Sequence, residues 1–475
     1  MSIGDILNTI DGWVWGIVMM VLIIAVGITL SAKTKFHAQK HIGLSLKYAV
    51  NNEEGGEGDV SSFGALTTAL AATVGTGNIV GVATAIMAGG PGALFWMEFA
   101  AFFGIATKYA EGVLAVKYRQ VKDDGSILGG PFYYIEKGMG SSWKWLAKMF
   151  ALFGSLAGAL GIGTSTQMNG IVEAICRVVD PEESHIMFGH YSYARVITTA
   201  IITIAVILVI IGGIQRIAQV TERVVPAMMV LYVVTALLIF LFNIKNLPHA
   251  IVEVVAGAFG LRAAAGGAFG AMWMAMQKGV ARGIFSNEAG LGSAPIAAAA
   301  AQTKECVRQG MVSSTGTFLD TIVICTMTGL CILMTGAHEQ GLGGVLVTIY
   351  AFSNGLPWPA ICGAVILALS LGLFAFSTIL GWDYYAERCF DYLTNGNKKA
   401  ILAYRWLYVA AVAVGPFVAL DALWAFADIM NGLMAFPNVI GLFALSGVVA
   451  KETKDFWERR QSGEYNDNLP EKKAK

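Results

Sequence analysis

Apolar stretches of about twenty residues recur along the whole chain, and this repetition constrains the fold more than any other feature of the sequence. A helix of that length crosses ~30 Å of hydrocarbon. Because 56% of its 475 residues are hydrophobic and only 13% are charged, the chain has more apolar surface than one water-soluble core can bury. Membrane-spanning strands would show about ten residues of strict alternation, which is absent. The sequence predicts an all-α integral membrane protein in a lipid bilayer.

Hydropathy and Gly/Pro punctuation predict about eleven spans. We expect them at 13–31, 62–89, 92–116, 147–174, 194–213, 223–243, 251–286 (interrupted), 309–335, 360–387, 401–420 and 422–450. The segment before the first span carries Asp5 and Asp11 and no Lys or Arg, which excludes a cleaved signal peptide. Lys and Arg gather in alternate loops, and this bias predicts an external N-terminus and a cytoplasmic C-terminus.

Two of the ten spans that follow the first contain glycine interruptions at corresponding places. The earlier one reads Gly75-Thr-Gly77, and the later one contains Gly266-Gly267 and Gly270. Paired interrupted spans predict two inverted five-helix halves with a binding site at the membrane midplane, although glycine also allows ordinary close helix packing. The expected organisation is an N-terminal helix and cytoplasmic loop (1–61), two five-helix repeats (62–243 and 251–450) and a cytoplasmic tail (451–475).

Five blocks of sequence stand out: 69–81 (ALAATVGTGNIVG), 89–96 (GGPGALFW), 129–134 (GGPFYY), 281–293 (ARGIFSNEAGLGS) and 318–322 (FLDTI). Together they resemble the alanine/glycine:cation symporter family, which includes sodium:alanine symporters. The resemblance implies the five-plus-five inverted repeat of LeuT-type transporters, within the amino acid–polyamine–organocation superfamily. It also implies Na⁺, or in some members H⁺, as the coupled ion in a prokaryotic inner membrane. It leaves the preferred substrate open.

A helix broken at the midplane exposes backbone N–H groups with a partial positive charge, which suits a substrate carboxylate. We expect the carboxylate against the backbone of 75–78, and the ammonium on carbonyls of Thr73 and of Gly266 and Gly267. Gln167 either binds the carboxylate or links helices as a polar contact. Bulky side chains, with Trp382, are expected to wall the pocket. The predicted substrate residues are Thr73, Gly75, Thr76, Gly77, Asn78, Gln167, Phe269, Met272 and Trp273.

Adjacent hydroxyls in the span 360–387 resemble the pair that holds the conserved sodium of LeuT-type folds. Carried over by position, the resemblance implies a Na⁺ site of the Ser377 and Thr378 hydroxyls with the carbonyls of Ala71, Val74 and Phe374. Hard oxygen ligands without a full carboxylate suit a monovalent ion that must leave again. The alternative is that both hydroxyls hydrogen-bond the preceding helical turn.

Acids inside membrane spans are expensive and therefore functional candidates. The sequence offers Glu98, Asp320, Asp383 and Asp428. Asp320 is the possible coupling acid: a second cation ligand, a proton site or the partner of a buried Lys or Arg. LeuT-type relatives often pair an Arg after the first-helix GxGN with an acid in the tenth helix as an outer gate. No Arg follows Asn78, so that gate cannot be carried over onto Asp428.

These features predict a secondary active symporter that couples uptake of alanine or glycine to inward Na⁺ movement by alternating access. The alternatives are H⁺ coupling, a channel and a membrane enzyme. No catalytic motif or P-loop occurs, so we expect neither an enzyme nor ATP use. Balanced charge argues against nucleic-acid binding. We expect no cofactor, with Na⁺ only as the co-transported ion, and a monomeric functional unit.

Overall fold

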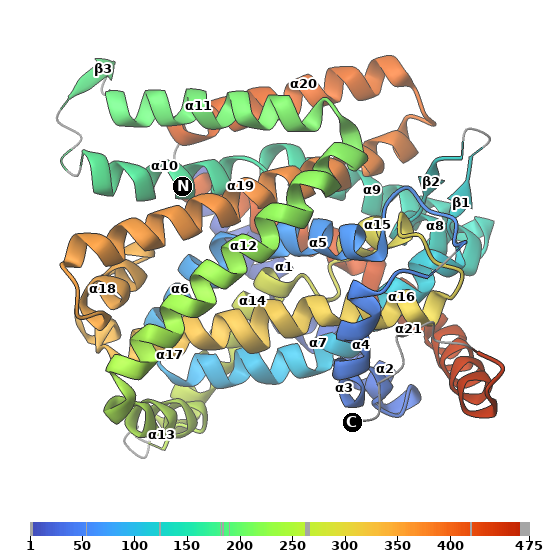
Figure 1. The fold of residues 1–475 in the computed structure, drawn as a ribbon, viewed down its shortest axis with the longest axis horizontal. Coiled ribbons are helices and arrows are strands. Elements are labelled where there is room, and N and C mark those ends of the chain that lie inside the picture. The colour runs from blue at the N-terminus through green and yellow to red at the C-terminus, as the bar shows by residue number, and fades with distance from the viewer. Residues whose placement is uncertain are drawn as a thin grey trace, which may run out of the picture.

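The computed structural model describes residues 3–53, 55–122, 125–180, 182, 185–189, 191–261, 267–418 and 420–465. These residues form an almost wholly helical molecule, as Figure 1 shows. Within them, regular strands form only two short antiparallel hairpins: β1 (Gln120–Val121) with β2 (Ile127–Leu128), and β3 (Ile186–Phe188) with β4 (Tyr191–Ser192). The predicted all-α class is confirmed.

The N-terminal region forms four helices outside the repeats. They are α1 (Ile3–Val14), α2 (Ile17–Lys33), α3 (His37–Lys40) and α4 (Ile42–Val50). Helix α2 takes the place of the expected span 13–31, and it packs against α7 (Gly92–Lys117) and α21 (Leu420–Ser462). The expected extra N-terminal helix is therefore present.

The first half begins with a helix that breaks as predicted. Its other members follow the expected spans, except that the third core helix is interrupted between Leu160 and Ser165. The elements besides α7 are α5 (Ser62–Thr73), π-helix η1 (Gly77–Gly81), α6 (Val82–Gly89), α8 (Pro131–Tyr133), π-helix η2 (Tyr134–Gly138), 3-10 helix η3 (Ser141–Trp143), α9 (Lys144–Leu160), α10 (Ser165–Val179), α11 (Tyr193–Ile210) and α12 (Gly213–Phe242).

The second half ends with α21, which continues to Ser462 without a helix end at the expected boundary at 450. The preceding elements are 3-10 helix η4 (Ile244–Asn246), α13 (Leu247–Ala258), α14 (Ala268–Asn287), α15 (Ala294–Ala299), α16 (Cys306–Thr317), π-helix η5 (Phe318–Cys325), α17 (Thr326–Met334), 3-10 helix η6 (Ala337–Glu339), α18 (Val345–Gly355), α19 (Ala360–Leu393), α20 (Lys398–Val414) and 3-10 helix η7 (Gly415–Phe417).

Eight helical runs in the described residues are long and apolar enough to cross a membrane. The pair Ser62–Thr73 and Gly77–Gly89, bent by 50°, makes a ninth. Helix α2 is shorter than these runs, and α14 is not among them. The membrane-spanning class is confirmed, while the number of eleven spans stays a prediction.

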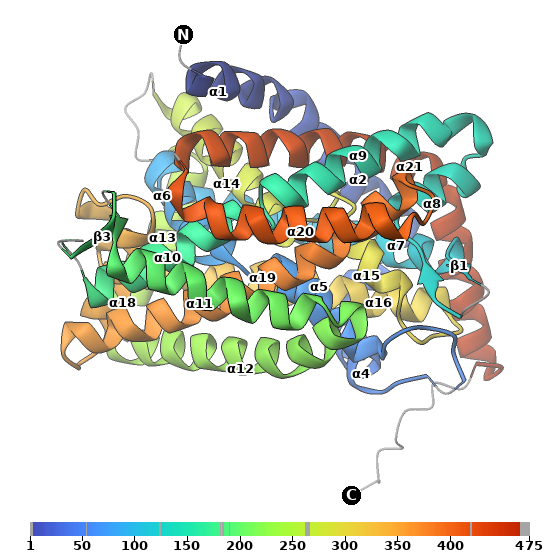
Figure 2. The same ribbon diagram turned by 90° about the horizontal axis from the view of Figure 1, so that it is seen from above.

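Glycines bring the broken first core helix close to its neighbours. A Cβ on Gly381 of α19 would lie 2.8 Å from the backbone nitrogen of Ala72 in α5. Only glycine permits such backbone approach, which small residues provide in membrane helix packing. Helix α5 consequently lies against α19 at the centre of the molecule, as both ribbon views show (Figures 1 and 2).

Candidate substrate and cation site

The first core helix opens where the Gly-Thr-Gly sequence predicts. Helix α5 ends at Thr73, Val74 has an extended conformation (φ −78°, ψ 92°), and π-helix η1 begins at Gly77. The Thr73 hydroxyl stays within α5 and donates to the Ala69 carbonyl at 3.1 Å. A helix start in the molecular interior presents amides that need acceptors. The predicted interruption in this helix is confirmed.

The first amides after the break already carry oxygen acceptors. The Gly75 N–H donates to Asn78 Oδ1 at 2.9 Å, and the Thr76 N–H donates to Gln167 Oε1 at 3.3 Å. Thr76 Oγ1 is buried and has no hydrogen-bond partner among the described residues. A substrate carboxylate that replaced these neutral oxygens would form stronger, charge-assisted bonds. Gln167 thus makes the helix-linking contact, with its Oε1 on the break and its Nε2 on the Ile162 carbonyl at 3.1 Å, while carboxylate binding by this residue stays a prediction.

The glycines of the break have no room for side chains. A Cβ on Gly75 would lie 2.6 Å from Thr378 Oγ1, and one on Gly77 would lie 3.3 Å from the Ser286 Cα. The break is therefore in direct contact with α19 on one side and with the C-terminal end of α14 on the other.

The five oxygen atoms predicted to bind the cation lie together between α5 and α19. Ser377 Oγ is 3.4 Å from the Ala71 carbonyl oxygen, and Thr378 Oγ1 is 3.4 Å from that of Val74. Both hydroxyls are also 2.9 Å from the Phe374 carbonyl oxygen, one turn back in α19. The alternative hydrogen bonds within α19 are thus present as well.

The 2.9 Å separations within α19 and the 3.4 Å separations between α19 and α5 indicate different kinds of contact. Hydroxyl hydrogen bonds have oxygen separations of about 2.7–2.8 Å, which the contacts to Phe374 approach. Oxygen ligands lie ~2.4 Å from Ca²⁺, an ion close to Na⁺ in radius, so two ligands at right angles about such an ion are ~3.4 Å apart. The 3.4 Å separations from α19 to α5 fit two ligands of one shared ion better than a direct hydrogen bond.

Asp320 is fully buried in π-helix η5 and lies against the first break. Its carboxylate accepts from Asn78 Nδ2 at 2.7 Å, Thr321 Oγ1 at 2.8 Å and Ser286 Oγ at 2.9 Å. Three donors can hold a buried carboxylate without a counter-ion. The buried Lys108 acts on Asp320 only through space, and no Lys or Arg in the described part of the chain forms a salt bridge with it. Asp320 instead positions Asn78, whose Oδ1 accepts from Gly75.

The sixth core helix is broken at a different place from the predicted one. Gly266 lies outside the described residues, and α14 runs from Ala268 to Asn287 without interruption. The chain leaves the helix at Glu288 (φ +56°), passes Gly290 (φ +91°) and Gly292 (φ +84°), and resumes as α15 at Ala294. Positive φ is available to glycine at little cost, which explains why this loop uses two.

Because the second break lies at a different place, the residues beside it differ from the predicted pocket wall. Phe269 is 73% exposed, and it precedes Phe285 by sixteen residues, or ~24 Å along α14. Met272 and Trp273 are half-buried in the same outer turns. The prediction that these three residues wall a pocket beside the break is therefore wrong. Phe285 and Ser286 lie there instead, and Trp382 is buried against the second break.

A cavity of about 540 Å³ reaches the first break from one end of the molecule. It extends past Thr76 and is bordered by Phe285 and Trp424, whose rings lie 5.6 Å apart. The salt bridge from Arg282 Nη1 to Asp428 Oδ2, at 3.7 Å, also borders it. Asp428 thus has an arginine partner at the cavity, but that arginine comes from α14 rather than from the sequence after Asn78.

At the opposite end of the first broken helix, hydrogen bonds hold the neighbouring segments together and leave the site closed on that side. Arg119 donates to four carbonyl oxygens, at 2.7–3.0 Å; they belong to Glu57, Ala299, Ala301 and Thr303. The backbone before α5 also pairs with the backbone after α15, since the Asp59 N–H donates to the Ala300 carbonyl at 2.8 Å. These bonds join the ends of both broken helices that lie away from the first cavity.

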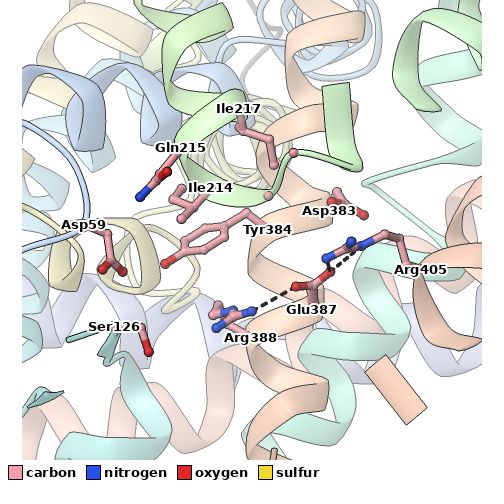
Figure 3. A pocket seen from close by; sticks show the side chains of 12 residues that line it. Asp59, Ser126, Ile214, Gln215, Ile217, Asp383, Tyr384, Glu387, Arg388 and Arg405 are labelled. Atoms are coloured by element: carbon pink, nitrogen blue, oxygen red, sulfur yellow. Dashed lines mark hydrogen bonds and ion pairs between the residues drawn. The ribbon is translucent and has the colours of Figure 1, made fainter. Parts of the chain in front are cut away.

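A second cavity of about 290 Å³ is lined by Asp59, which belongs to this closure, and by side chains of α19; Figure 3 shows the lining residues. Glu387 on α19 accepts from Arg405 at 2.6 Å and from Arg388 at 2.9 Å. Asp383, one turn earlier, is buried, and its Oδ1 has no partner among the described residues. The candidate acid Asp383 therefore lines this second cavity rather than the cavity that reaches the first break.

Sequence reasoning missed the buried acids at the second break. Glu288 Oε1 accepts from Trp382 Nε1 at 2.9 Å, and Glu111 Oε1 accepts from the Gly290 N–H at 3.2 Å and from Asn438 Nδ2 at 2.7 Å. These contacts join the break to α7, α19 and α21. A signal was present, because Gly290-Leu-Gly292 repeats the spacing of Gly75-Thr-Gly77.

Two broken helices that meet in the interior, one half of the protein contributing each, define a membrane transporter with the LeuT-type fold. The crystal structure of MhsT in complex with L-phenylalanine is similar in fold, with a TM-score of 0.56 at 14% identity. The similarity covers 84% of this chain and 99% of that one.

The model of the sodium:alanine symporter family matches residues 1–470, and the chain belongs to this family. An uncharacterized transporter of Haemophilus influenzae is 50% identical, over 98% of this chain and 99% of the relative. The sodium/alanine symporter AgcS of Methanococcus maripaludis is 44% identical, over 98% of this chain and 100% of the relative. The predicted family and transporter class are confirmed.

Proposed function

We propose that this protein is a secondary active symporter that couples uptake of alanine or glycine to inward movement of Na⁺. The observation that carries the proposal is the convergence of five oxygens, from Ala71, Val74, Phe374, Ser377 and Thr378, next to the backbone amides of the first break, which neutral side-chain oxygens now accept from. One end of this short segment suits a cation and the other suits a carboxylate. The 44% identity to a protein named as a sodium/alanine symporter supports the same assignment.

One end of the site is open to a cavity and the other end is closed, which is the arrangement that an alternating-access cycle requires. The outer cavity reaches Thr76, while Arg119 and the backbone pairs hold the inner ends together. Substrate and ion would enter from the side of Arg282 and Asp428. Release would then require the Arg119 bonds to break and the outer cavity to close. A rocking of one helix bundle against the other around a fixed midplane site supplies this motion.

The pocket favours small side chains. Phe285 and Trp424 border the cavity next to the break, and Gly77 is packed against Ser286. Alanine and glycine would leave these contacts in place, whereas leucine would have to displace a ring. An apolar pocket discriminates by about 1–3 kcal/mol for each methylene that does not fit.

The driving force is sufficient. Alanine is a neutral zwitterion, so one Na⁺ per cycle moves one charge, worth about 2.3 kcal/mol per 100 mV. A tenfold Na⁺ gradient adds about 1.4 kcal/mol, and the sum supports accumulation on the order of a few hundred-fold at one-to-one coupling.

Proton coupling is the second candidate, and the buried carboxylate of Asp320 favours it. The deciding experiment uses the purified protein in liposomes with labelled alanine, comparing an imposed Na⁺ gradient with an imposed pH gradient. Accumulation driven by Na⁺ at equal pH supports the proposal. Accumulation driven by pH in the absence of Na⁺ would replace Na⁺ with H⁺, and unsaturable flux of either solute alone would indicate a channel.

We further propose an inner-membrane location in a prokaryote, with the N-terminus outside, the C-terminus in the cytoplasm and a monomer as the functional unit. The Lys and Arg distribution supports this orientation. The monomeric unit is supported by a different observation: one chain encloses a complete candidate site, from the outer cavity to the inner closure.

A further inference from the structure

Three potential metal ligands lie together at one end of the molecule, away from the substrate site. Glu253 of α13 is 6% exposed, and His338 and Glu339 belong to 3-10 helix η6. His249 lies one turn before Glu253 on the same face of α13. Helix α13 packs against α17, which η6 follows directly (Figure 1).

The spacing of these groups is too long for hydrogen bonds. His338 Nε2 is 3.6 Å from Glu253 Oε2 and 3.9 Å from Glu339 Oε1, and His249 Nε2 is 3.4 Å from Glu253 Oε1. Charge-assisted bonds of this kind would measure about 2.7–2.9 Å. Ligands bound tetrahedrally at ~2.1 Å from a zinc ion are ~3.4 Å apart, which is close to the observed separations.

We propose that Glu253, His338 and Glu339 form a zinc site, and that His249 lies beside it on the other oxygen of the Glu253 carboxylate. One atom from each of the first three residues lies within 4.8 Å of the others, so a single ion can contact all of them. Imidazole and carboxylate are ligands that Zn²⁺ accepts, and water completes a site with an open position. The side chains of Glu339 and His249 are each 70% exposed, so the ion can enter directly from the external water.

A bound zinc ion would fasten α13 to the segment that borders the outer cavity. Residues Gly343–Leu346, just after η6, line that cavity, and Thr348 of α18 donates to the Ile79 carbonyl of η1 at 3.2 Å. Closing the outer cavity requires this segment to move toward the site. Zinc at the site would hold it in place and slow transport.

Zinc binding is tested on the purified full-length protein after chelation, by isothermal titration with ZnCl₂ and by the visible spectrum of added Co²⁺. We expect one saturable site. Glu339→Gln changes an exposed side chain and should leave the fold intact, and His338→Ala removes the central ligand. Loss of an outer-shell partner of a metal already costs about 10–100-fold, so each ligand substitution should weaken zinc at least about tenfold.

His185→Asn is the matched control, because His185 is also exposed and lies 3.7 Å from a carboxylate oxygen, that of Asp180. This variant should bind zinc as the parent does. The proposed site would be overturned if the parent showed no saturable zinc binding. It would also be overturned if both Glu339→Gln and His338→Ala bound zinc as tightly as the parent. Neither readout depends on transport. In liposomes, external zinc should slow alanine uptake by the parent and not by Glu339→Gln, and equal slowing of both would refute the fastening of the outer segment.

Discussion

Replacement of both cation-site hydroxyls is the sharpest test of the candidate site. Ser377→Ala with Thr378→Ala removes two of the five oxygens and leaves the carbonyls of Ala71, Val74 and Phe374. A contact to a charged group contributes about 1.5–3 kcal/mol, so two contribute about 3–6 kcal/mol before water replaces part of the loss. We expect Na⁺ binding to weaken by on the order of 100-fold.

The assay measures alanine binding to the purified protein across a series of Na⁺ concentrations. Because coupling between two ligands is reciprocal for binding, the double variant should bind alanine weakly at low Na⁺ and recover when Na⁺ is raised. Ser370→Ala is the control. Its hydroxyl is buried in the same helix and donates to the Ile366 carbonyl at 2.8 Å, so it reports the loss of a hydrogen bond within α19 alone.

Normal alanine binding by the double variant at low Na⁺ would refute this reasoning. The hydroxyls would then serve only the bonds to Phe374, and the coupling ion would lie elsewhere, with Asn78 and Asp320 as the next candidates. A Ser370→Ala variant that lost Na⁺ affinity to the same degree would also refute it, since the effect would belong to helix stability.

Three further substitutions test separate parts of the proposal. Asp320→Asn keeps the shape and removes the charge that orients Asn78, so we expect a normally folded protein with uptake reduced at least about 100-fold, and full activity at every pH would leave Asp320 a structural contact. Leucine should not compete with alanine for binding to the parent, but it should compete for binding to Phe285→Ala, because this substitution opens the cavity. If leucine competes in the parent as well as glycine does, the size argument is contradicted. Arg119→Ala removes bonds to four carbonyls on the inner side. Ala300, which is buried in the parent, is replaced by cysteine as a reporter, and this cysteine should react with a maleimide at least about tenfold faster when Arg119 is absent. An unchanged rate argues against Arg119 as a closure.

The first break could be predicted because its signal is local. Gly75-Thr-Gly77 interrupts an apolar span, and the polar Asn78 follows directly, so both the interruption and the need for acceptors are visible in the sequence. The pairing of Ser377 with this helix came from the family resemblance. The close approach of Gly381 to Ala72 is what brings the two helices together.

The second break could not be located as easily, because what stabilises it is distant in sequence. Glu288 is tolerated inside the molecule since Trp382 donates to it, and Gly290 is held by Glu111. Glu288, Gly290 and Gly292 lie beyond residue 286, the expected end of the interrupted span, so the apolar pattern predicted the interruption at Gly266-Gly267 instead. The partner of Asp428 was missed for the same reason, because Arg282 precedes it by 146 residues.

Coupling between ion and substrate has a direct route in one peptide group. The Val74 carbonyl oxygen faces Thr378, and the Gly75 N–H, at the other end of the same planar unit, faces the acceptor now provided by Asn78. A cation on the carbonyl polarises the unit and makes the N–H a stronger donor, since linked hydrogen bonds reinforce one another by about 10–30%. Na⁺ would therefore strengthen carboxylate binding at Gly75 without any rearrangement between the two sites. Asp320 holds Asn78 by its Nδ2, so a substrate carboxylate that replaces the Asn78 and Gln167 oxygens on the Gly75 and Thr76 amides would leave Asn78 itself in place.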